Sequence, residues 1–270
     1  MADNRQFDEK WKSAGVSKGP EEPDIFVLQG RIPVTQRQFN LYHYFEYISG
    51  VAKSRNCESA LELGCGRGTI SLYLSKYLGI DVVASDLSQD AVDLAKRNFE
   101  THKARGEVRI ADAFKLPFAD NSFDMTVSIG LVEHFENYAD IYKEQWRVLK
   151  PGGVVISLNV PGKKSIQMLN AVYRFFVRAV GRKVNEDYFR NDDEPKDFKK
   201  ATEKAGFADV ETFYVNSFPL FTPMSMKVEP FITLIYRFIY VLRGIFMAYP
   251  FKGSKLFSQA HFLIGIKPGK

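Results

Sequence analysis

The sequence predicts an α/β fold in which a doubly wound, mostly parallel sheet carries helices on both faces. Short apolar runs alternate with helical patterns from residue 58 to residue 159, as in parallel strands joined by right-handed crossovers. Three glycines, Gly64, Gly66 and Gly68, follow the first apolar run directly, and Asp86 ends the second run. Ligands of open parallel sheets bind at this edge of the sheet.

The elements of this alternation can be assigned in chain order. Runs rich in valine and isoleucine predict strands over residues 59–63, 81–86, 107–112, 123–129 and 153–160. Apolar residues spaced three and four apart predict helices over residues 69–78, 88–102 and 138–149. Ser88 is the expected N-cap of the second of these helices.

The pattern changes after residue 160. A helix over 196–207 that ends at Gly206, a strand over 209–217 and a final strand over 260–267 are predicted. Residues 161–194 and 218–258 fit no core element, and connections of this length commonly cover a site. We therefore expect an N-terminal helical cap (1–50), a cofactor-binding core (51–160) and a remainder (161–270) with two substrate-side insertions, within one structural domain.

Charge and aromatic side chains are unevenly distributed along the 270 residues. The net charge is +5, but residues 1–160 carry a net −3 and residues 161–270 a net +8, with 20 of the 38 aromatic residues. This division suggests a common cofactor for the first part and a specific partner for the second. The start lacks a secretion signal, and Cys57 and Cys65 have no metal-ligand spacing, so free thiols and a cytoplasmic location are expected.

The glycine turn has the composition of a ligand-binding loop. Without side chains its backbone N–H groups can approach a ligand closely. The spacing is G-x-G-x-G, preceded by Glu62, whereas a pyrophosphate cofactor requires G-x-G-x-x-G. An acid here favours a cationic ligand with an amino group. Asp86 would accept hydrogen bonds from ribose hydroxyls, and Asp112, which ends the third predicted strand, would meet the edge of a base.

These residues resemble the class I S-adenosylmethionine-dependent methyltransferases, and within them the type 11 group that includes the ubiquinone/menaquinone methyltransferases. "LELGCGRG" is similar to the first motif of that family and "VVASDLS" to its ribose-binding motif. "DAFKLPFADNSFDMTVSIGLVEHFEN" resembles its adenine-binding segment with the fourth strand, and "RVLKPGGVVI" its turn into strand five. The resemblance implies a Rossmann-like sheet of seven strands, the last antiparallel, and S-adenosyl-L-methionine as cofactor.

The resemblance also implies roles for individual positions. The methionine end of the cofactor would be held by Glu62, Gly64 and Gly66, with Cys65 between them as a small side chain. The ribose and adenine would meet Asp86, Leu87, Asp112 and Ala113, and the sulfonium would lie above Ser128 and Gly130. No metal site is expected.

The chemistry of methyl transfer requires little more than alignment, because the sulfonium makes its methyl carbon electrophilic. A base is useful where the nucleophile is a hydroxyl or an acidic carbon, and O- or C-methylation is favoured over N-methylation. His134, just after the fourth strand, is the candidate catalytic base. Its alternative role is to order the loop through a hydrogen bond.

The apolar stretch 230–251 contains Arg237 and Arg243, which disfavours a membrane-spanning helix. It remains open as a cap over the substrate, an interfacial helix on anionic lipid, or a helix packed in the core or a dimer contact. We expect a small-molecule or lipid-like acceptor and no DNA. Peripheral membrane contact through 218–258 and a homodimer are the partner interactions this region allows.

Three other functions stay open at this point. The first is an RNA or protein methyltransferase of the same fold. The second is a NAD-dependent oxidoreductase, which the loop spacing and Glu62 disfavour. The third is a non-catalytic, membrane-associated scaffold that binds S-adenosylmethionine.

Overall fold

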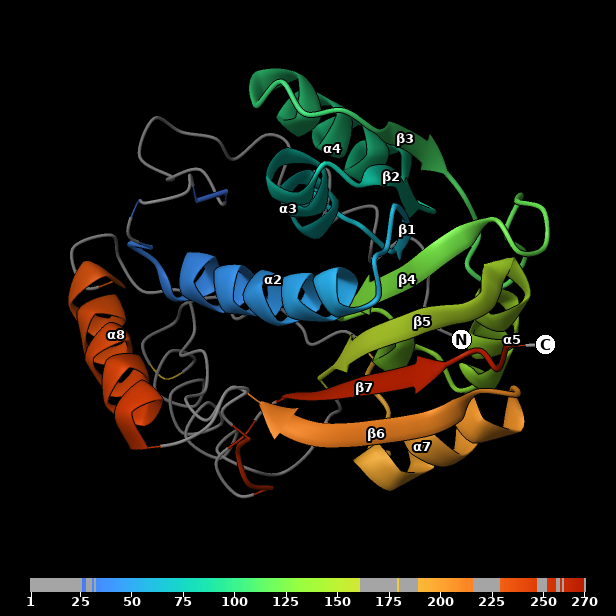
Figure 1. The fold of residues 1–270 in the computed structure, drawn as a ribbon. Helices are drawn as coiled ribbons and strands as arrows, with labels where there is room; N and C mark the ends of the chain where they lie inside the picture. The colour runs from blue at the N-terminus through green and yellow to red at the C-terminus, as the bar shows by residue number, and fades with distance from the viewer. Residues whose placement is uncertain are drawn as a thin grey trace.

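The computed structural model describes residues 26–27, 31, 33–160, 179, 189–215, 229–246, 252–255, 258 and 260–269. Within these residues seven strands form one sheet in the order β3-β2-β1-β4-β5-β7-β6 (Figure 1). The strands are β1 (Ser59–Leu63), β2 (Asp81–Asp86), β3 (Glu107–Ile110), β4 (Phe123–Ile129), β5 (Leu149–Asn159), β6 (Ala208–Val215) and β7 (Ala260–Ile266). β1 to β5 pair in parallel, and β7 runs antiparallel between β5 and β6. The predicted fold class is confirmed.

Helices cover both faces of this sheet. One face packs against α2 (Gln36–Ser54), α3 (Thr69–Leu78) and α4 (Gln89–Thr101). The other packs against α5 (Ala139–Val148), α7 (Pro195–Lys204) and the connection between β3 and β4. Alternate residues of a strand point to opposite faces, so Met125 and Val127 join the first core while Thr126 and Ser128 point to the second face.

Several element bounds differ from the prediction. β3 ends at Ile110, two residues early, because Asp112 turns back to form an isolated bridge with Lys115. β5 begins at Leu149, four residues early, since Leu149 already pairs with Phe123 across a register shift. Residues 1–25 of the predicted cap, most of 161–194, and residues 218–228 and 247–251 lie outside the described residues.

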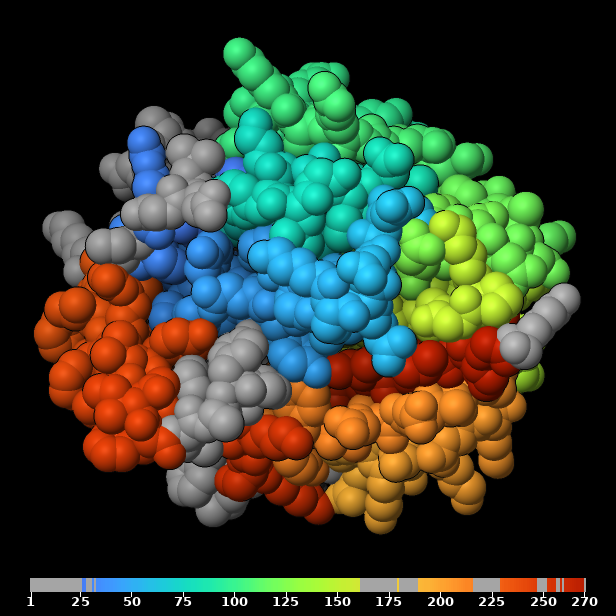
Figure 2. All heavy atoms as spheres, viewed as in Figure 1, coloured from blue at the N-terminus to red at the C-terminus, as the bar shows by residue number. Residues whose placement is uncertain are grey.

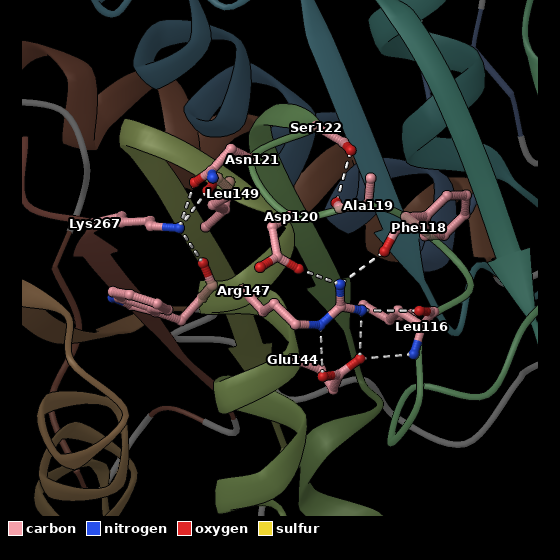
Figure 3. A network of polar contacts seen from close by, with 11 residues as sticks. Leu116, Phe118, Ala119, Asp120, Asn121, Ser122, Glu144, Arg147, Leu149 and Lys267 are labelled. Atoms are coloured by element: carbon pink, nitrogen blue, oxygen red, sulfur yellow. Dashed lines mark hydrogen bonds and ion pairs between the residues drawn. The ribbon is translucent and has the colours of Figure 1, made fainter.

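A polar clamp holds the β3–β4 connection against α5 (Figure 3). Arg147 donates to the carbonyls of Leu116 and Phe118 at 2.9 and 2.7 Å and forms a fork with the Glu144 carboxylate. Glu144 also accepts from the N–H of Leu116 at 2.8 Å. The guanidinium holds the pKa of Glu144 below its usual value, despite partial burial. The clamp thereby fixes the segment that returns the chain from β3 to β4.

The last described helix, α8 (Glu229–Phe246), lies beside α2 at the margin of the molecule (Figure 1). Only Glu229, Thr233 and Tyr236 of this helix are buried. Of the alternatives left open for this stretch, a helix packed in the protein core does not fit α8. None of the helices in the described part of the chain is long and apolar enough to span a bilayer.

Candidate functional site

The turn between β1 and α3 is built from glycines in the left-handed backbone region. φ is +63° at Gly64, +52° at Gly66 and +69° at Gly68, a conformation that other residues adopt only with strain. The N–H of Cys65 donates to the carbonyl of Ser85 at 2.9 Å. The turn is thus tied to β2 at the carboxyl end of the parallel strands.

Gly64 also makes room for a neighbour within the protein. A Cβ atom at this position would lie 2.7 Å from Cδ1 of Leu131, which follows β4. Because Gly64 has no side chain, Leu131 can pack against the turn. The same lack of a side chain would let a ligand approach the backbone. Cys65 is buried, and burial raises the pKa of its thiol, so the thiol is a small packed group and not a nucleophile.

Glu62 lies at the end of β1 beneath the first turn of α3. Its Oε2 accepts from the N–H and the hydroxyl of Ser71 at 2.8 and 2.5 Å. Gly68, at the N-cap of α3, has no side chain to satisfy the first N–H groups of the helix, and Glu62 takes over that task. Burial raises the pKa of Glu62 to about 7, although the bonds from Ser71 oppose this.

Asp86, the last residue of β2, is joined directly to the glycine turn. Its Oδ2 accepts from the N–H of Gly66 at 2.9 Å, and its Oδ1 accepts from the N–H of Ser88 at 3.0 Å. Ser88 occupies the predicted N-cap position of α4, but its hydroxyl makes no capping bond. The Asp86 carboxylate is therefore oriented by the backbone on both sides.

Two apolar side chains are exposed beside this carboxylate. Leu87 is 49% exposed, and Ile110, which lies opposite Asp86 in the β2–β3 register, is 46% exposed. Apolar side chains next to an oriented acid are suited to a flat ring joined to a polar sugar. Ile110 was not predicted as a site residue; its position at the end of a strand is the signal that could have found it.

Asp112 and Ala113 follow β3 in a tight turn. Oδ1 of Asp112 accepts from the N–H of Phe114 at 2.9 Å, which forms the turn. The Asp112 side chain is exposed and Ala113 is half-buried. Both lie just beyond the carboxyl end of β3, on the same edge of the sheet as Asp86.

Ser128 and Gly130 lie at the end of β4. The Ser128 hydroxyl is buried and donates to Oγ of Ser157 at 3.1 Å, in a group of polar side chains that also includes Asn159. Gly130 has a φ of +69°, and a Cβ there would come no closer than 3.7 Å to Glu133. Gly130 is partly exposed and a Cβ there would meet only the Glu133 carboxyl at van der Waals distance, while the Ser128 side chain is engaged inside the protein.

His134 ends the short helix η1 (Val132–His134) and is buried. Its Nδ1 lies 2.6 Å from the carbonyl oxygen of Phe189. A carbonyl only accepts hydrogen bonds, so Nδ1 carries the proton and donates it. The Nε2 atom is then the ring nitrogen that can accept a proton.

Glu133, which the sequence suggested to be a solvated side chain beside His134, is instead completely buried. Its Oε1 accepts from the N–H of Val160 at 3.1 Å, and its carbonyl accepts from the N–H of Asn191 at 2.8 Å. Together with the bond from His134, these contacts join the η1 segment to the end of β5 and to residues 189–191. No local sequence signal predicts this, because the partners lie far along the chain.

The parallel strands bring these groups to one edge of the sheet. Asp86 contacts the glycine turn through Gly66, and Leu131 contacts it through Gly64. Leu131 in turn accepts from the N–H of His134 at 3.1 Å. The arrangement offers two carboxylates and an exposed apolar pair beside one glycine turn, and Leu131 joins the backbone of His134 to that turn. No cluster of three or more metal-ligating side chains occurs in the described ranges.

Comparison with known proteins identifies the type of site. A family model described as "Methyltransferase domain" matches residues 61–157. A demethylmenaquinone methyltransferase of Staphylococcus aureus is 32% identical over 173 residues, which span 58% of this chain and 70% of the relative. A ubiquinone/menaquinone biosynthesis C-methyltransferase of Desulfotalea psychrophila is 26% identical over 180 residues, 64% of this chain and 72% of that protein.

A solved structure agrees at the level of fold. The phosphoethanolamine N-methyltransferase 2 of Haemonchus contortus, in complex with S-adenosyl-L-methionine, superposes with a TM-score of 0.51 at 17% identity. The match covers 90% of this chain and 61% of that one. The matched family region contains the glycine turn and Asp86. The chain therefore belongs to the class I S-adenosylmethionine-dependent methyltransferases of the type 11 group, and S-adenosylmethionine is its cofactor.

Proposed function

We propose that this chain transfers a methyl group from S-adenosylmethionine to a small hydrophobic acceptor of the quinone or lipid-like class. The proposal is carried by the two curated relatives, whose names assign them to menaquinone and ubiquinone biosynthesis. The aromatic, acid-poor second part of the chain supports an apolar acceptor. Since those relatives act on quinone precursors, methylation at carbon or oxygen is favoured over nitrogen.

The two carboxylates of the site suit a cationic adenosine cofactor. When bound, S-adenosylmethionine supplies a methyl carbon made electrophilic by its sulfonium. Glu62 is buried and accepts its bonds from Ser71, so a nearby amino group would compensate the cost of its negative charge. We assign Glu62 and the backbone of Gly64 and Gly66 to the methionine end.

The ribose and the adenine are assigned to the ends of β2 and β3. Each oxygen of Asp86 already accepts one backbone N–H, and a carboxylate oxygen can accept a second bond. Asp86 is therefore ready to accept ribose hydroxyls. Leu87 and Ile110 would contact the faces of the adenine, and Asp112 and Ala113 its edge.

We assign His134 as the general base of the reaction. The bond from Nδ1 to the carbonyl of Phe189 fixes the tautomer and the orientation of the ring, as catalytic imidazoles require. Nε2 would take the proton of a hydroxyl or an acidic carbon as the methyl group is transferred. The backbone at Gly130 and the side chain of Leu131 would border the acceptor and exclude water.

The acceptor can be identified by isotope transfer. The chain is incubated with S-adenosylmethionine that carries a trideuterated methyl group, and with prenylated demethyl-quinols, a phospholipid extract, RNA or peptides. Mass spectrometry should find the label in the quinol or lipid pool, and the Asp86→Ala variant should lose it. Label confined to RNA or peptide, or absent from every pool, would overturn the proposed acceptor class.

The cellular location is part of this proposal. Cys57 and Cys65 are free thiols in the structure, and burial raises the pKa of both. Unpaired cysteines support a reducing compartment. We therefore place the chain in the cytoplasm.

A further inference from the structure

One face of α8 presents a continuous stripe of apolar side chains to the outside. Figure 2 shows this helix forming the outer surface at one margin of the molecule. The stripe consists of Phe231, Leu234, Phe238, Val241, Ile245 and Phe246, each 58–80% exposed. The first five follow one another at a spacing of three or four residues, which places them on one side of the helix, and Phe246 is its last residue. An exposed apolar patch of this extent marks an interaction surface.

The opposite face of α8 is held on α2 by polar bonds. Glu229 accepts from the backbone and the side chain of Gln36 at 3.0 and 3.2 Å. The Tyr236 hydroxyl donates to Oε1 of Gln36, and the Tyr240 hydroxyl donates to Glu46, both at 3.0 Å. The helix is thus fixed with its polar side inward and its apolar side outward. This inverts the usual arrangement of a surface helix.

The charged side chains that follow Glu229 in the sequence have one sign. Glu229 is the last acidic residue of the sequence, and residues 230–270 contain six lysines and arginines. Arg237 and Arg243 lie on α8 itself and are half-buried, and Lys252 is exposed beyond the helix. Arg243 follows Tyr236 by seven residues and therefore lies on the side of α8 that faces α2. An apolar stripe in a segment that has lysines and arginines but no acid after Glu229 is complementary to a lipid surface that carries negative head groups.

We propose that the apolar stripe of α8 docks on an anionic lipid surface, with the helix lying in the plane of the interface. Symmetric contact between two copies would bring together two segments of the same positive charge, which disfavours a dimer through this surface. β6, which runs in the same direction as β5, points toward the side at which α8 lies (Figure 1). Docking would then hold the carboxyl edge of the sheet near the membrane. The inference goes beyond the proposed function and does not require it.

Vesicle flotation tests this inference without any methyl donor or acceptor. The chain is mixed with vesicles of phosphatidylcholine alone, or of phosphatidylcholine with about a third phosphatidylglycerol. The negative head groups of phosphatidylglycerol attract a basic, apolar helix to the vesicle surface. We expect the chain to float with the anionic vesicles and to bind the neutral ones several-fold less. A chain that stays with the soluble fraction in both cases would overturn the proposal.

The stripe itself is tested by Phe231→Ser/Phe238→Ser, which removes two rings that are 65% and 64% exposed. Anionic vesicles should bind this variant at least about tenfold more weakly, because two large apolar side chains no longer enter the interface. Lys96→Glu, on the exposed face of α4, is the control and should float like the original chain. Unchanged flotation of the serine variant would contradict the assignment to α8. Light scattering without vesicles measures whether the chain forms a dimer. A dimer that the serine substitutions dissociate would also contradict the proposal, because the stripe would then be a contact between two copies.

Discussion

Asp86 shows at the scale of a single residue how the fold prepares a binding group. Two backbone N–H groups, from Gly66 and Ser88, orient its carboxylate from within the protein. A ligand that bonds to an oriented carboxylate loses less entropy than one that must order the group first. This supports Asp86 as the acceptor of the ribose hydroxyls, because the carboxylate is already ordered in the folded protein before the ligand binds.

Substitution of Asp86 by alanine should lower the affinity for S-adenosylmethionine by about 10- to 100-fold. The estimate rests on about 1.5–3 kcal/mol for hydrogen bonds to a charged group. Calorimetric titration measures the affinity, and S-adenosylhomocysteine should show the same loss because its ribose is identical. A folded Asp86→Ala chain with unaltered affinity would refute the role of Asp86.

Glu62 predicts a pH dependence of cofactor binding. Its pKa is raised to about 7 by burial, so in the free protein it is mostly protonated at pH 6 and mostly ionised at pH 7.5. A cationic ligand prefers the ionised form, and binding should therefore release a proton below pH 7. We expect the affinity to rise roughly five- to tenfold from pH 6 to pH 7.5 and then to level off.

Titration calorimetry in buffers of different ionisation enthalpy counts the released proton. Glu62→Gln is the matched control, because its side-chain carbonyl still accepts from Ser71 but cannot ionise. Its affinity should not vary over this pH range. The same pKa shift has the opposite consequence for stability. Folding disfavours the ionised carboxyl of Glu62, so the free chain should lose stability as pH rises from about 4.5 to 7.

His134 has two roles that different substitutions can separate. In His134→Asn the amide nitrogen lies near the position of Nδ1 and keeps a donor for the carbonyl of Phe189, but nothing replaces Nε2. In His134→Ala both are lost. If the imidazole is the base, both variants should lose about 10²–10⁴-fold in turnover with cofactor affinity unchanged.

The comparison of the two variants is decisive for this assignment. A histidine that merely fastens residue 189 would leave the asparagine variant active and the alanine variant impaired. Turnover of the identified acceptor, measured with saturating S-adenosylmethionine as a function of pH, distinguishes the outcomes. Retention of the original pH profile in His134→Asn would exclude proton transfer by this residue.

The sequence could single out the candidate residues whose signal is local. Glu62 and Asp86 adjoin the glycine turn or follow a strand at a recognisable spacing, and the structure joins Asp86 to that turn. The sequence alone did not assign Leu131, Ile110 or Glu133 to the candidate site, because their place beside it depends on contacts with segments that are distant in the sequence. The packing of Leu131 against Gly64 cannot be read from either stretch alone.

At the scale of elements, the strands and helices of residues 59–148 were largely predictable. β1, β2, β4 and α3 have the predicted bounds, because their apolar periodicity is uninterrupted. β5 was predicted too short, since Lys-Pro-Gly-Gly at 150–153 has the composition of a turn. Pairing of Leu149 with Phe123 overrides that local preference. The predicted division into cap, core and remainder stays a prediction.

The clamp around Arg147 makes a prediction about the β3–β4 connection. Arg147→Ala removes the donors to two backbone carbonyls and the fork with Glu144, and should destabilise the fold by about 1–3 kcal/mol. Arg147→Lys should restore little, because an ammonium cannot form the fork. Urea unfolding measures the loss, and amide exchange should become faster at residues 113–122.

Lys143→Ala is the control for this clamp. Lys143 lies on the same helix and pairs with Asp140 at 2.8 Å, but both side chains are more than half exposed. Such a surface pair contributes little, and the substitution should change stability by less than about 1 kcal/mol. Equal losses in the Arg147 and Lys143 variants would mean that the clamp does not hold the connection.

At the scale of the whole molecule, the two parts of the chain have different tasks. The near-neutral first part builds the glycine turn and both candidate carboxylates, and the basic second part supplies β6, β7 and α8. The outward stripe of α8 is the feature that sequence alone left undecided. Its periodicity is the same for a buried or an exposed face, and only the bonds to α2 determine which side points outward.

Binding of the cofactor should stabilise the whole fold, because the site joins β1, β2 and the first turns of α3 and α4. A ligand at 100 times its dissociation constant adds about 2.7 kcal/mol, which for a chain of this size raises the melting temperature by roughly 5 °C. Differential scanning fluorimetry should show this shift with S-adenosylmethionine and S-adenosylhomocysteine, but not with NAD⁺ or NADH. Asp86→Ala should need about 10- to 100-fold more cofactor for the same shift. The G-x-G-x-G turn and the Glu62 carboxyl disfavour a pyrophosphate. A comparable shift of the melting temperature with NADH would therefore contradict the assignment of this site to a cationic cofactor.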